Sequence, residues 1–268
     1  MTYQKIQLFP ERPWVTLEYF GNDLRGDDRD AMLVIPGGGY GIICSDREGY
    51  PIAMAYYLQG MNTFVLSYSI KEQIKSPYQP LEEATAAMLY IRAHAEEFRI
   101  KPDRVFAVGF SAGGHLAAWL GTCWDHPAMN ALFPCKGEKN RPTGVILCYA
   151  VITECGRQET CFHKLYGRNG LTREEIDAVS PHKFADESSS PAFIMHTFDD
   201  ERVPIKNALL LADAYNEKKV PFEMHVYPHA PHGVALGTDV TSHNKPDWEN
   251  EAIAGWVAAS RVWMRSVK

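Results

Sequence analysis

A serine lies at the centre of a glycine-flanked pentapeptide that could present a nucleophile. Residues 109–113 read Gly-Phe-Ser-Ala-Gly, between the apolar run 104–108 and the helix-like segment 114–120. This pattern predicts a strand, a sharp turn with Ser111 at its apex, and a helix. The glycines two positions to either side suit such a turn, because larger side chains there would collide with the neighbouring strand and helix. A hydroxyl presented in this way can attack a carbonyl carbon.

An acyl-transfer serine also needs a general base, a carboxylate that orients the base, and N–H donors for the oxyanion. The candidate base is His232, in a Pro-His-Gly sequence that follows a predicted strand, and His229 is its competitor. The candidate carboxylates are Asp199 and Asp200, directly after the apolar strand predicted at 192–197. The candidates therefore follow one another along the chain in the order Ser, Asp, His.

A run of glycines follows another predicted strand. Residues 31–35 read as a buried strand, and residues 36–41 read Pro-Gly-Gly-Gly-Tyr-Gly. Backbone amides in such a loop are unshielded and could hold an oxyanion. A flexible turn or a phosphate-cradling loop is the alternative interpretation. The dinucleotide-binding fingerprint is not met, because Ile42 stands where its third glycine would follow Gly37 and Gly39.

In these motifs the chain resembles the α/β-hydrolase superfamily. More narrowly, it resembles the bacterial acetyl esterase/lipase group related to hormone-sensitive lipase and to acetyl-xylan esterases. The resemblance covers nearly the whole chain from about Ala31 onward, and it rests on residues 36–40, 109–114, 199–204 and 231–233. One departure is Pro36, which replaces the histidine of the family's usual His-Gly-Gly-Gly loop. Whatever orientation that histidine gives the loop must therefore come from elsewhere.

By matching positions, the resemblance implies the residues of a catalytic site. The implied triad is Ser111, Asp200 and His232, and the implied oxyanion-hole amides are those of Gly38, Gly39 and Ala112. Asp200 is preferred to Asp199 because the family's carboxylate lies four residues before a proline, here Pro204. His232 is preferred to His229 because a glycine follows it.

The rest of the chain predicts the elements that position these residues. Apolar runs typical of strands buried on both faces occur at 31–35, 63–68, 104–108, 145–149 and 192–197. An apolar stripe over 81–98 predicts a helix, residues 45–48 fit a capping box for a helix through Leu58, and a last helix is expected at about 248–265. We expect an α/β-hydrolase fold, with a mostly parallel sheet flanked by helices, as a single domain over residues 1–268.

The segment 152–190 breaks this rhythm of strands and helices, and it holds one short helical piece at 173–178. In this fold an insertion after the sixth strand usually forms a cap over the active site, and a surface excursion is the alternative. Two aromatic residues could offer rings on which a sugar stacks. They are Tyr40, beside the glycine loop, and Trp124, after the nucleophile helix; burial in the core is the alternative for each.

Composition and charge exclude other classes of function. With a net charge of -6 and no basic stripe, the chain of 268 residues is not expected to bind nucleic acid. It lacks an apolar run of membrane-span length and a signal-like start, so we expect a soluble, cytoplasmic protein with no membrane partner. Its six cysteines are then expected to be reduced rather than paired. Cys155, Cys161 and His163 could suggest a metal site, but no paired C-x-x-C accompanies them, so neither metal nor cofactor is expected.

The sequence therefore predicts a serine carboxylesterase that hydrolyses short-chain acyl esters through an acyl-enzyme. Acetylated sugars or xylo-oligosaccharides are its leading substrates, through the resemblance to acetyl-xylan esterases. The expected partner is a small-molecule ester, and the oligomeric state is left open. The alternatives are a serine peptidase of the prolyl-oligopeptidase type and a non-catalytic binding protein built on a hydrolase fold.

Overall fold

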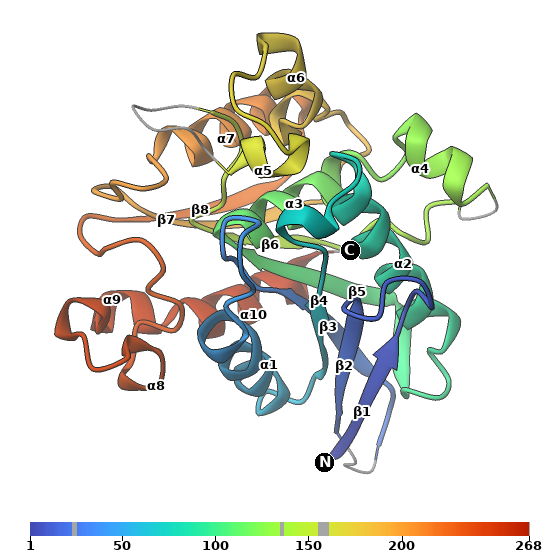
Figure 1. Ribbon diagram of the computed structural model, residues 1–268. Coiled ribbons are helices and arrows are strands. Elements are labelled where there is room, and N and C mark those ends of the chain that lie inside the picture. The colour runs from blue at the N-terminus through green and yellow to red at the C-terminus, as the bar shows by residue number, and fades with distance from the viewer. Residues whose placement is uncertain (23–25, 135–136, 155–160, 268) are drawn as a thin grey trace.

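The computed structural model describes residues 1–22, 26–134, 137–154 and 161–267. Over these residues one eight-stranded sheet runs through the molecule in the order β1-β2-β4-β3-β5-β6-β7-β8, with helices on both faces (Figure 1). The strands are β1 (Thr2–Gln7), β2 (Thr16–Gly21), β3 (Arg29–Ile35), β4 (Asn62–Ser67), β5 (Ile100–Phe110), β6 (Val145–Cys148), β7 (Ala192–Thr197) and β8 (Phe222–Tyr227). β1 and β2 pair antiparallel, and β3 to β8 are parallel. The predicted mostly parallel sheet is confirmed.

Successive residues of the central strands are buried on opposite faces of the sheet. In β3, Met32 and Val34 belong to one hydrophobic cluster, whereas Leu33 and Ile35 belong to the other. This double burial explains the uninterrupted apolar run in the sequence. The sequence did not predict β1. Its first four residues are exposed on a sheet edge, so they need no apolar pattern.

The helices lie on the two faces and at the upper rim of the sheet as drawn in Figure 1. They are α1 (Tyr50–Tyr57), α2 (Gln79–Ala93), α3 (Ser111–Thr122), α4 (Pro127–Leu132), α5 (Phe162–Tyr166), α6 (Arg173–Ala178), α7 (Lys206–Lys218), α8 (Asp239–Ser242), α9 (Glu251–Ala254) and α10 (Trp256–Ser266). Short 3-10 turns occur at Lys71–Gln73, Pro181–Lys183 and Pro246–Trp248, and a π-helical turn at Ser45–Gly49. None of the described helices is both long and apolar enough to cross a membrane.

Two helix predictions need correction. The capping box predicted at 45–48 does not form: these residues make a π-helical turn without a side-chain cap. Its Glu48 is buried and bonds elsewhere in the fold, so tertiary contacts have replaced the local bond. The single helix predicted at 248–265 is divided at Gly255 into α9 and α10. Its apolar face is nevertheless buried as predicted, with Trp256 0% and Trp263 6% exposed.

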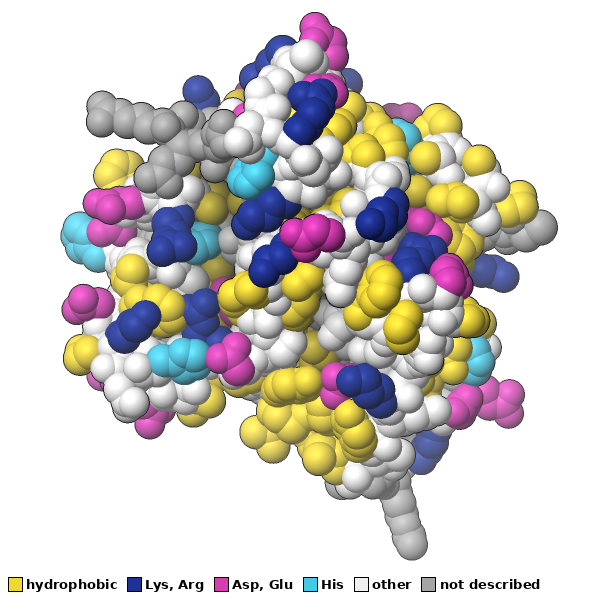
Figure 2. All heavy atoms as spheres, in the orientation of Figure 1, with side chains coloured by type: hydrophobic (Ala, Val, Ile, Leu, Met, Phe, Trp, Pro, Cys, Tyr) yellow, Lys and Arg dark blue, Asp and Glu magenta, His cyan; other side chains and the backbone are white. Residues whose placement is uncertain are grey.

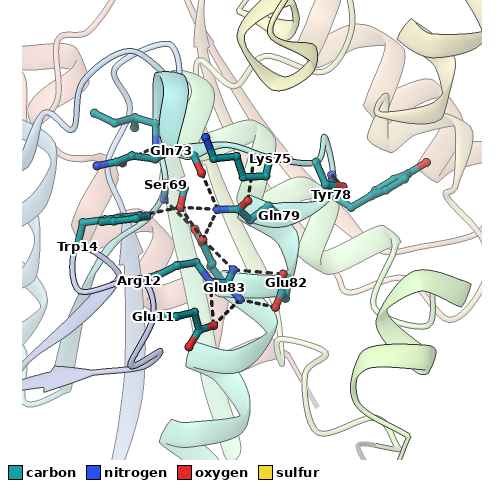
Figure 3. Close-up of polar contacts among 12 residues, drawn as sticks. Glu11, Arg12, Trp14, Ser69, Gln73, Lys75, Tyr78, Gln79, Glu82 and Glu83 are labelled. Atoms are coloured by element: carbon teal, nitrogen blue, oxygen red, sulfur yellow. Dashed lines mark hydrogen bonds and ion pairs between the residues drawn. The ribbon is translucent and has the colours of Figure 1, made fainter.

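A buried polar network fastens the connection between β1 and β2 to the start of α2 (Figure 3). The side chain of Glu83 is fully buried and accepts hydrogen bonds from Arg12 at 3.1 Å and Gln79 at 3.0 Å. The backbone N–H and the hydroxyl of Ser69 also donate to Glu83, at 2.7 and 2.6 Å. Trp14 in turn donates to the Ser69 hydroxyl at 2.9 Å. One carboxylate thus satisfies donors from three separate segments.

The cysteines that the structure describes are free thiols: Cys44, Cys123, Cys148 and Cys161. Burial raises the pKa of the Cys161 thiol to about 12, so this group stays protonated near neutral pH. Cys155, a member of the metal cluster considered from the sequence, lies outside the described residues, as does Cys135.

Candidate active site

Ser111 occupies the sharp turn predicted between a strand and a helix, here β5 and α3. Its φ is +52°, a left-handed conformation that a residue with a side chain adopts only under strain. The flanking glycines make the turn possible. A Cβ on Gly109 would stand 2.2 Å from the carbonyl oxygen of Gly113, and a Cβ on Gly113 would stand 2.1 Å from that of Ile35. The backbone of α3 therefore approaches β3 and β5 more closely than any side chain would allow.

The structure brings the other two predicted residues to this serine. Nε2 of His232 lies 2.9 Å from Oγ of Ser111, and Nδ1 of His232 lies 2.7 Å from Oδ2 of Asp200. Ser111 directly follows β5, Asp200 follows β7, and His232 follows β8. Because these strands are parallel, their carboxyl ends meet at one edge of the sheet. The result is a hydroxyl, an imidazole and a carboxylate in one hydrogen-bonded line.

The Asp200 carboxylate is fixed by more than the histidine. Its side chain is fully buried, and its Oδ1 accepts the backbone N–H groups of Arg202 at 2.9 Å and Val203 at 2.8 Å. Burial by itself would raise the pKa of Asp200, but the hydrogen bond and charge of His232, with the Val203 amide, hold that pKa below its ordinary value. The group therefore remains a carboxylate and can orient the imidazole.

The competing residues from the sequence form a second pair at the surface. Nδ1 of His229 lies 3.0 Å from Oδ2 of Asp199, and the two side chains are 82% and 45% exposed. The backbone N–H of Ala230 donates to the same carboxylate at 3.1 Å. The structure thus separates two neighbouring Asp-His pairs, and it places only the inner pair against Ser111.

The glycine loop lies beside the nucleophile with amides available. A Cβ on Gly37 would stand 3.0 Å from the Cβ of Ser111. Gly37 uses its own N–H for a bond to Glu48, whereas the N–H groups of Gly38 and Gly39 donate no hydrogen bond within the described chain. Ala112 is the second residue of α3, where a helix leaves its N–H groups without an intrahelical acceptor. The three predicted amides are therefore available to a ligand.

Glu48 is a site residue that the sequence did not reveal, because the capping-box pattern explained it locally. It is 2% exposed, and its Oε2 accepts the Gly37 N–H at 2.9 Å. Its Oε1 accepts the Tyr149 hydroxyl at 3.0 Å, and that hydroxyl accepts the Ala235 N–H at 3.0 Å. The Tyr149 ring stands against the His232 ring, with centroids 5.0 Å apart. Glu48 therefore connects the glycine loop to the histidine loop.

Tyr40 does not offer a ring to a sugar, so this prediction is wrong. It is fully buried, and its hydroxyl lies 2.6 Å from Nδ1 of His115. Nε2 of His115 lies 2.6 Å from the Val179 carbonyl, which can only accept, so Nε2 carries the proton and Tyr40 donates to Nδ1. Burial lowers the pKa of His115 to about 4. The expectation that His115 serves packing and local hydrogen bonding is confirmed.

The second aromatic residue, Trp124, lies at the opposite end of α3 from Ser111, and its place in a sugar site stays a prediction. Trp124 follows the carboxyl end of α3, whereas Ser111 is the first residue of that helix. A helix of this length separates them by about 18 Å. The Arg141 guanidinium lies over the Trp124 ring, 5.4 Å from its centroid.

Described parts of the segment 152–190 lie against the glycine loop and α3. Nζ of Lys164, in α5, donates to the Gly39 carbonyl at 2.9 Å. The Phe162 ring packs on His115, with ring centroids 4.8 Å apart. The helical piece predicted at 173–178 is α6, and residues 155–160 lie outside the described chain.

Two cavities lie at opposite edges of the sheet. One of about 630 Å³ is lined by residues such as Pro102, Thr143 and Pro191, at the amino ends of the strands and away from Ser111. The other, of about 550 Å³, is lined by the loop around His232. The second of these two cavities adjoins the candidate active site.

The strand order, with a serine after β5, a carboxylate after β7 and a histidine after β8, defines an α/β hydrolase. Within this class the chain belongs to the BD-FAE family, whose model matches residues 20–215. The resemblance drawn from the motifs is thereby confirmed.

Known proteins similar to this chain include enzymes that act on xylan. Endo-1,4-beta-xylanase B of Butyrivibrio fibrisolvens is 40% identical over 223 residues, which are 81% of this chain and 34% of that protein. An acetylxylan esterase of Xylanibacter ruminicola is 26% identical over 226 residues, 80% of this chain and 43% of that protein. The chain thus spans less than half the length of these curated relatives. The solved structure of an acetyl ester-xyloside bifunctional hydrolase from Caldicellulosiruptor lactoaceticus matches with a TM-score of 0.81 and 28% identity, covering 98% of this chain and 96% of that one.

Proposed function

We propose that this chain is a serine carboxylesterase that hydrolyses short-chain acyl esters, with acetylated sugars or xylo-oligosaccharides as its substrates. The observation that carries the proposal is the contact of 2.9 Å between Ser111 Oγ and His232 Nε2, with Asp200 on the other ring nitrogen. A hydroxyl, a base and an orienting carboxylate in this order are what acyl transfer to serine requires.

In the first half of the proposed reaction, Oγ of Ser111 attacks the ester carbonyl carbon while His232 takes the hydroxyl proton. The carbonyl oxygen becomes an oxyanion, which in this proposal the N–H groups of Gly38, Gly39 and Ala112 stabilise; the free N–H groups of Gly38 and Gly39 support this role. The positive imidazole is stabilised by the buried carboxylate of Asp200. His232 then returns the proton to the alcohol oxygen as the carbon–oxygen bond breaks, leaving the acyl group on Ser111.

In the second half, water replaces the alcohol. His232 removes a proton from the water as its oxygen attacks the acyl carbon, and the same amides hold the new oxyanion. The proton passes to Oγ of Ser111 when the acyl–serine bond breaks, which releases a carboxylic acid and restores the free enzyme. No other group has to enter this cycle.

The substrate part of the proposal rests on the short segment over the site and on the relatives. The segment 152–190, held to the glycine loop by Lys164, would act as a small cap and offers no long apolar run to line a tunnel for a fatty chain. The acetyl ester-xyloside bifunctional hydrolase, which matches over nearly its whole length, supports an acetylated sugar.

Two measurements test the two halves of this proposal. Turnover of 4-nitrophenyl acetate, butyrate and octanoate should be fastest for the short chains, and Ser111→Ala should abolish it. Acetate should be released from acetylated xylo-oligosaccharides. Fastest turnover of octanoate would contradict the short-acyl proposal, and the absence of acetate release from the sugars would leave a short-chain carboxylesterase with another alcohol.

A further inference from the structure

The cavity of about 550 Å³ beside His232 has an unusual lining for a site that takes a neutral ester. It contains the cationic side chains of Arg47, Arg202 and Lys245 together with the indole of Trp248. Figure 2 shows Lys and Arg side chains on the left of the visible face, with acidic and histidine side chains among them.

The Arg47 side chain lines this cavity and is only 13% exposed. Its Nη1 donates to the Gly233 carbonyl at 2.8 Å, next to His232, and its guanidinium lies over the Trp248 ring, 4.2 Å from the centroid. The nearest carboxylate oxygen, on Glu48, is 3.9 Å away and already accepts the Tyr149 hydroxyl. Nζ of Lys245 also lies over Trp248, 4.3 Å from its centroid.

The charges that face this cavity do not cancel. Two acidic residues line it, Asp199 and Glu201. Asp199 already accepts hydrogen bonds from His229 and the Ala230 N–H, which lower the pKa of its carboxyl. Within the described chain, the exposed side chain of Arg202 has neither an ion pair nor a hydrogen bond. The lining thus holds three cationic and two anionic side chains, a net charge of +1.

The proposed reaction determines which part of the substrate reaches this cavity. His232 must give its proton to the oxygen of the leaving alcohol, so that oxygen has to come within hydrogen-bond reach of Nε2. The cavity is lined by His232 and by the two residues before it, Ala230 and Pro231. The alcohol, rather than the acyl group, therefore extends toward the cations.

From this geometry we infer that the cavity beside His232 is an alcohol subsite for a substrate whose alcohol carries a carboxylate, such as an acidic sugar. The inference rests on the proposed esterase function and specifies its substrate class. Guanidinium groups bind carboxylates through paired N–H donors, and an ammonium adds a point charge. Because the rim of the cavity is open to solvent, each exposed cation should contribute only modestly to the binding of the carboxylate.

The test compares two acetate esters that differ in one charge. 4-Acetoxybenzoate presents a carboxylate on its alcohol, and its methyl ester is the neutral counterpart. The measured quantity is the ratio of kcat/KM for the anionic ester to that for the neutral ester, in wild type and in each variant. Intrinsic reactivity differs between the esters but cancels when the ratio is compared between variants.

The variants have opposite expected signs. Arg202→Gln and Lys245→Gln should each lower the ratio by about 3- to 10-fold at low ionic strength, and Glu201→Gln should raise it. Added salt should lower the wild-type ratio. Lys101→Gln removes an equal exposed charge at the start of β5, on the far edge of the sheet, and should leave the ratio unchanged.

An unchanged ratio in both Arg202→Gln and Lys245→Gln would overturn the inference while leaving the esterase proposal intact. Conversely, absence of turnover with both esters would refute the esterase proposal, and the subsite is then tested by calorimetry with 4-hydroxybenzoate and its methyl ester. Tighter binding of the anion that weakens in Lys245→Gln supports the subsite. Equal binding of the two compounds refutes it.

Discussion

The carboxylate of Asp200 lies 2.7 Å from Nδ1 of His232, a residue 32 positions farther along the chain. Asp199, one position before Asp200, makes a similar contact with His229, three positions before His232, but at the surface. The two pairs have the same chemistry and different surroundings. Burial and the hydrogen-bonded line to Ser111 distinguish the inner pair as the candidate for catalysis.

Substitution of the two aspartates should therefore have unequal effects. Asp200→Asn should lower kcat by about 10⁴-fold, because an amide supports the wrong tautomer of the imidazole. Asp199→Asn removes an exposed contact and should change kcat only a few-fold. Steady-state kinetics with 4-nitrophenyl acetate measures both. Equal losses, or a larger loss in Asp199→Asn, would reverse the assignment of the acid.

The serine and the histidine should act as one unit. Ser111→Ala and His232→Ala should each reduce kcat by about 10⁶-fold, and the double variant should be little worse than either, because each single change already disables the nucleophile. Circular dichroism should show that all three variants fold. Losses that multiply in the double variant would indicate that the two residues do not share a step.

Glu48 should position the site without touching the substrate. In Glu48→Gln the amide NH₂ group would face either the Gly37 N–H or the Tyr149 hydroxyl, so one donor loses its acceptor and the two loops shift. We expect kcat to fall by about 10- to 100-fold with a smaller change in KM.

The matched control for Glu48 is Asp46→Asn, an exposed acid in the same turn. It should leave kcat unchanged. Tyr149→Phe, which removes the bond to Glu48 and the acceptor for Ala235, should reproduce part of the Glu48→Gln loss. Wild-type kcat in both Glu48→Gln and Tyr149→Phe would show that this network does not position the site.

Acid should destabilise the fold through His115. Burial lowers the pKa of His115 to about 4, whereas an unfolded histidine titrates near about 6.5. Between these values the unfolded chain binds a proton that the folded protein does not, so the free energy of unfolding should fall as pH decreases, by at most about 1.4 kcal/mol per pH unit from this group. Urea unfolding at pH 4.5 to 7 measures the slope.

The slope should be shallower in His115→Gln, which cannot titrate in this range. Other groups, such as His182, keep their contribution in both proteins, so the difference isolates His115. Identical slopes in the wild type and His115→Gln would contradict the buried neutral imidazole.

The network around Glu83 should matter for stability and little for chemistry. Glu83→Ala removes the acceptor of Arg12, Gln79 and Ser69 together, and should cost about 3 kcal/mol of unfolding free energy, because it leaves the buried donors of Ser69 and Gln79 without an acceptor. Glu82→Ala, which loses a more exposed pairing with Arg12, should cost about 1 kcal/mol or less. Urea unfolding distinguishes them, and equal costs would show that burial of Glu83 is not what makes it important.

The sequence predicted the parts of this protein that depend on local pattern. Double-sided burial gives apolar runs, so β3 to β7 could be read directly, and the tight turn at Ser111 requires the glycines at 109 and 113. Motifs at the carboxyl ends of parallel strands then had to meet at one edge of the sheet, which gave Ser111, Asp200 and His232 in chain order.

Only the tertiary structure decided the roles that depend on which side chain is buried against which partner. Sequence left Tyr40 as a possible platform, and the fold buries it against His115. The sequence explained Glu48 as a local cap. The fold instead places that carboxylate between the glycine loop at Gly37 and, through Tyr149, the histidine loop at Ala235, 198 residues farther along the chain (235 − 37). The sequence also did not indicate that Arg47, Arg202 and Lys245 line one cavity. These residues are far apart along the chain and come together only in the folded structure. Local sequence patterns determine where strands, turns and helices form. Contacts between distant parts of the chain determine which side chains are buried together, and this burial determines what each side chain can do.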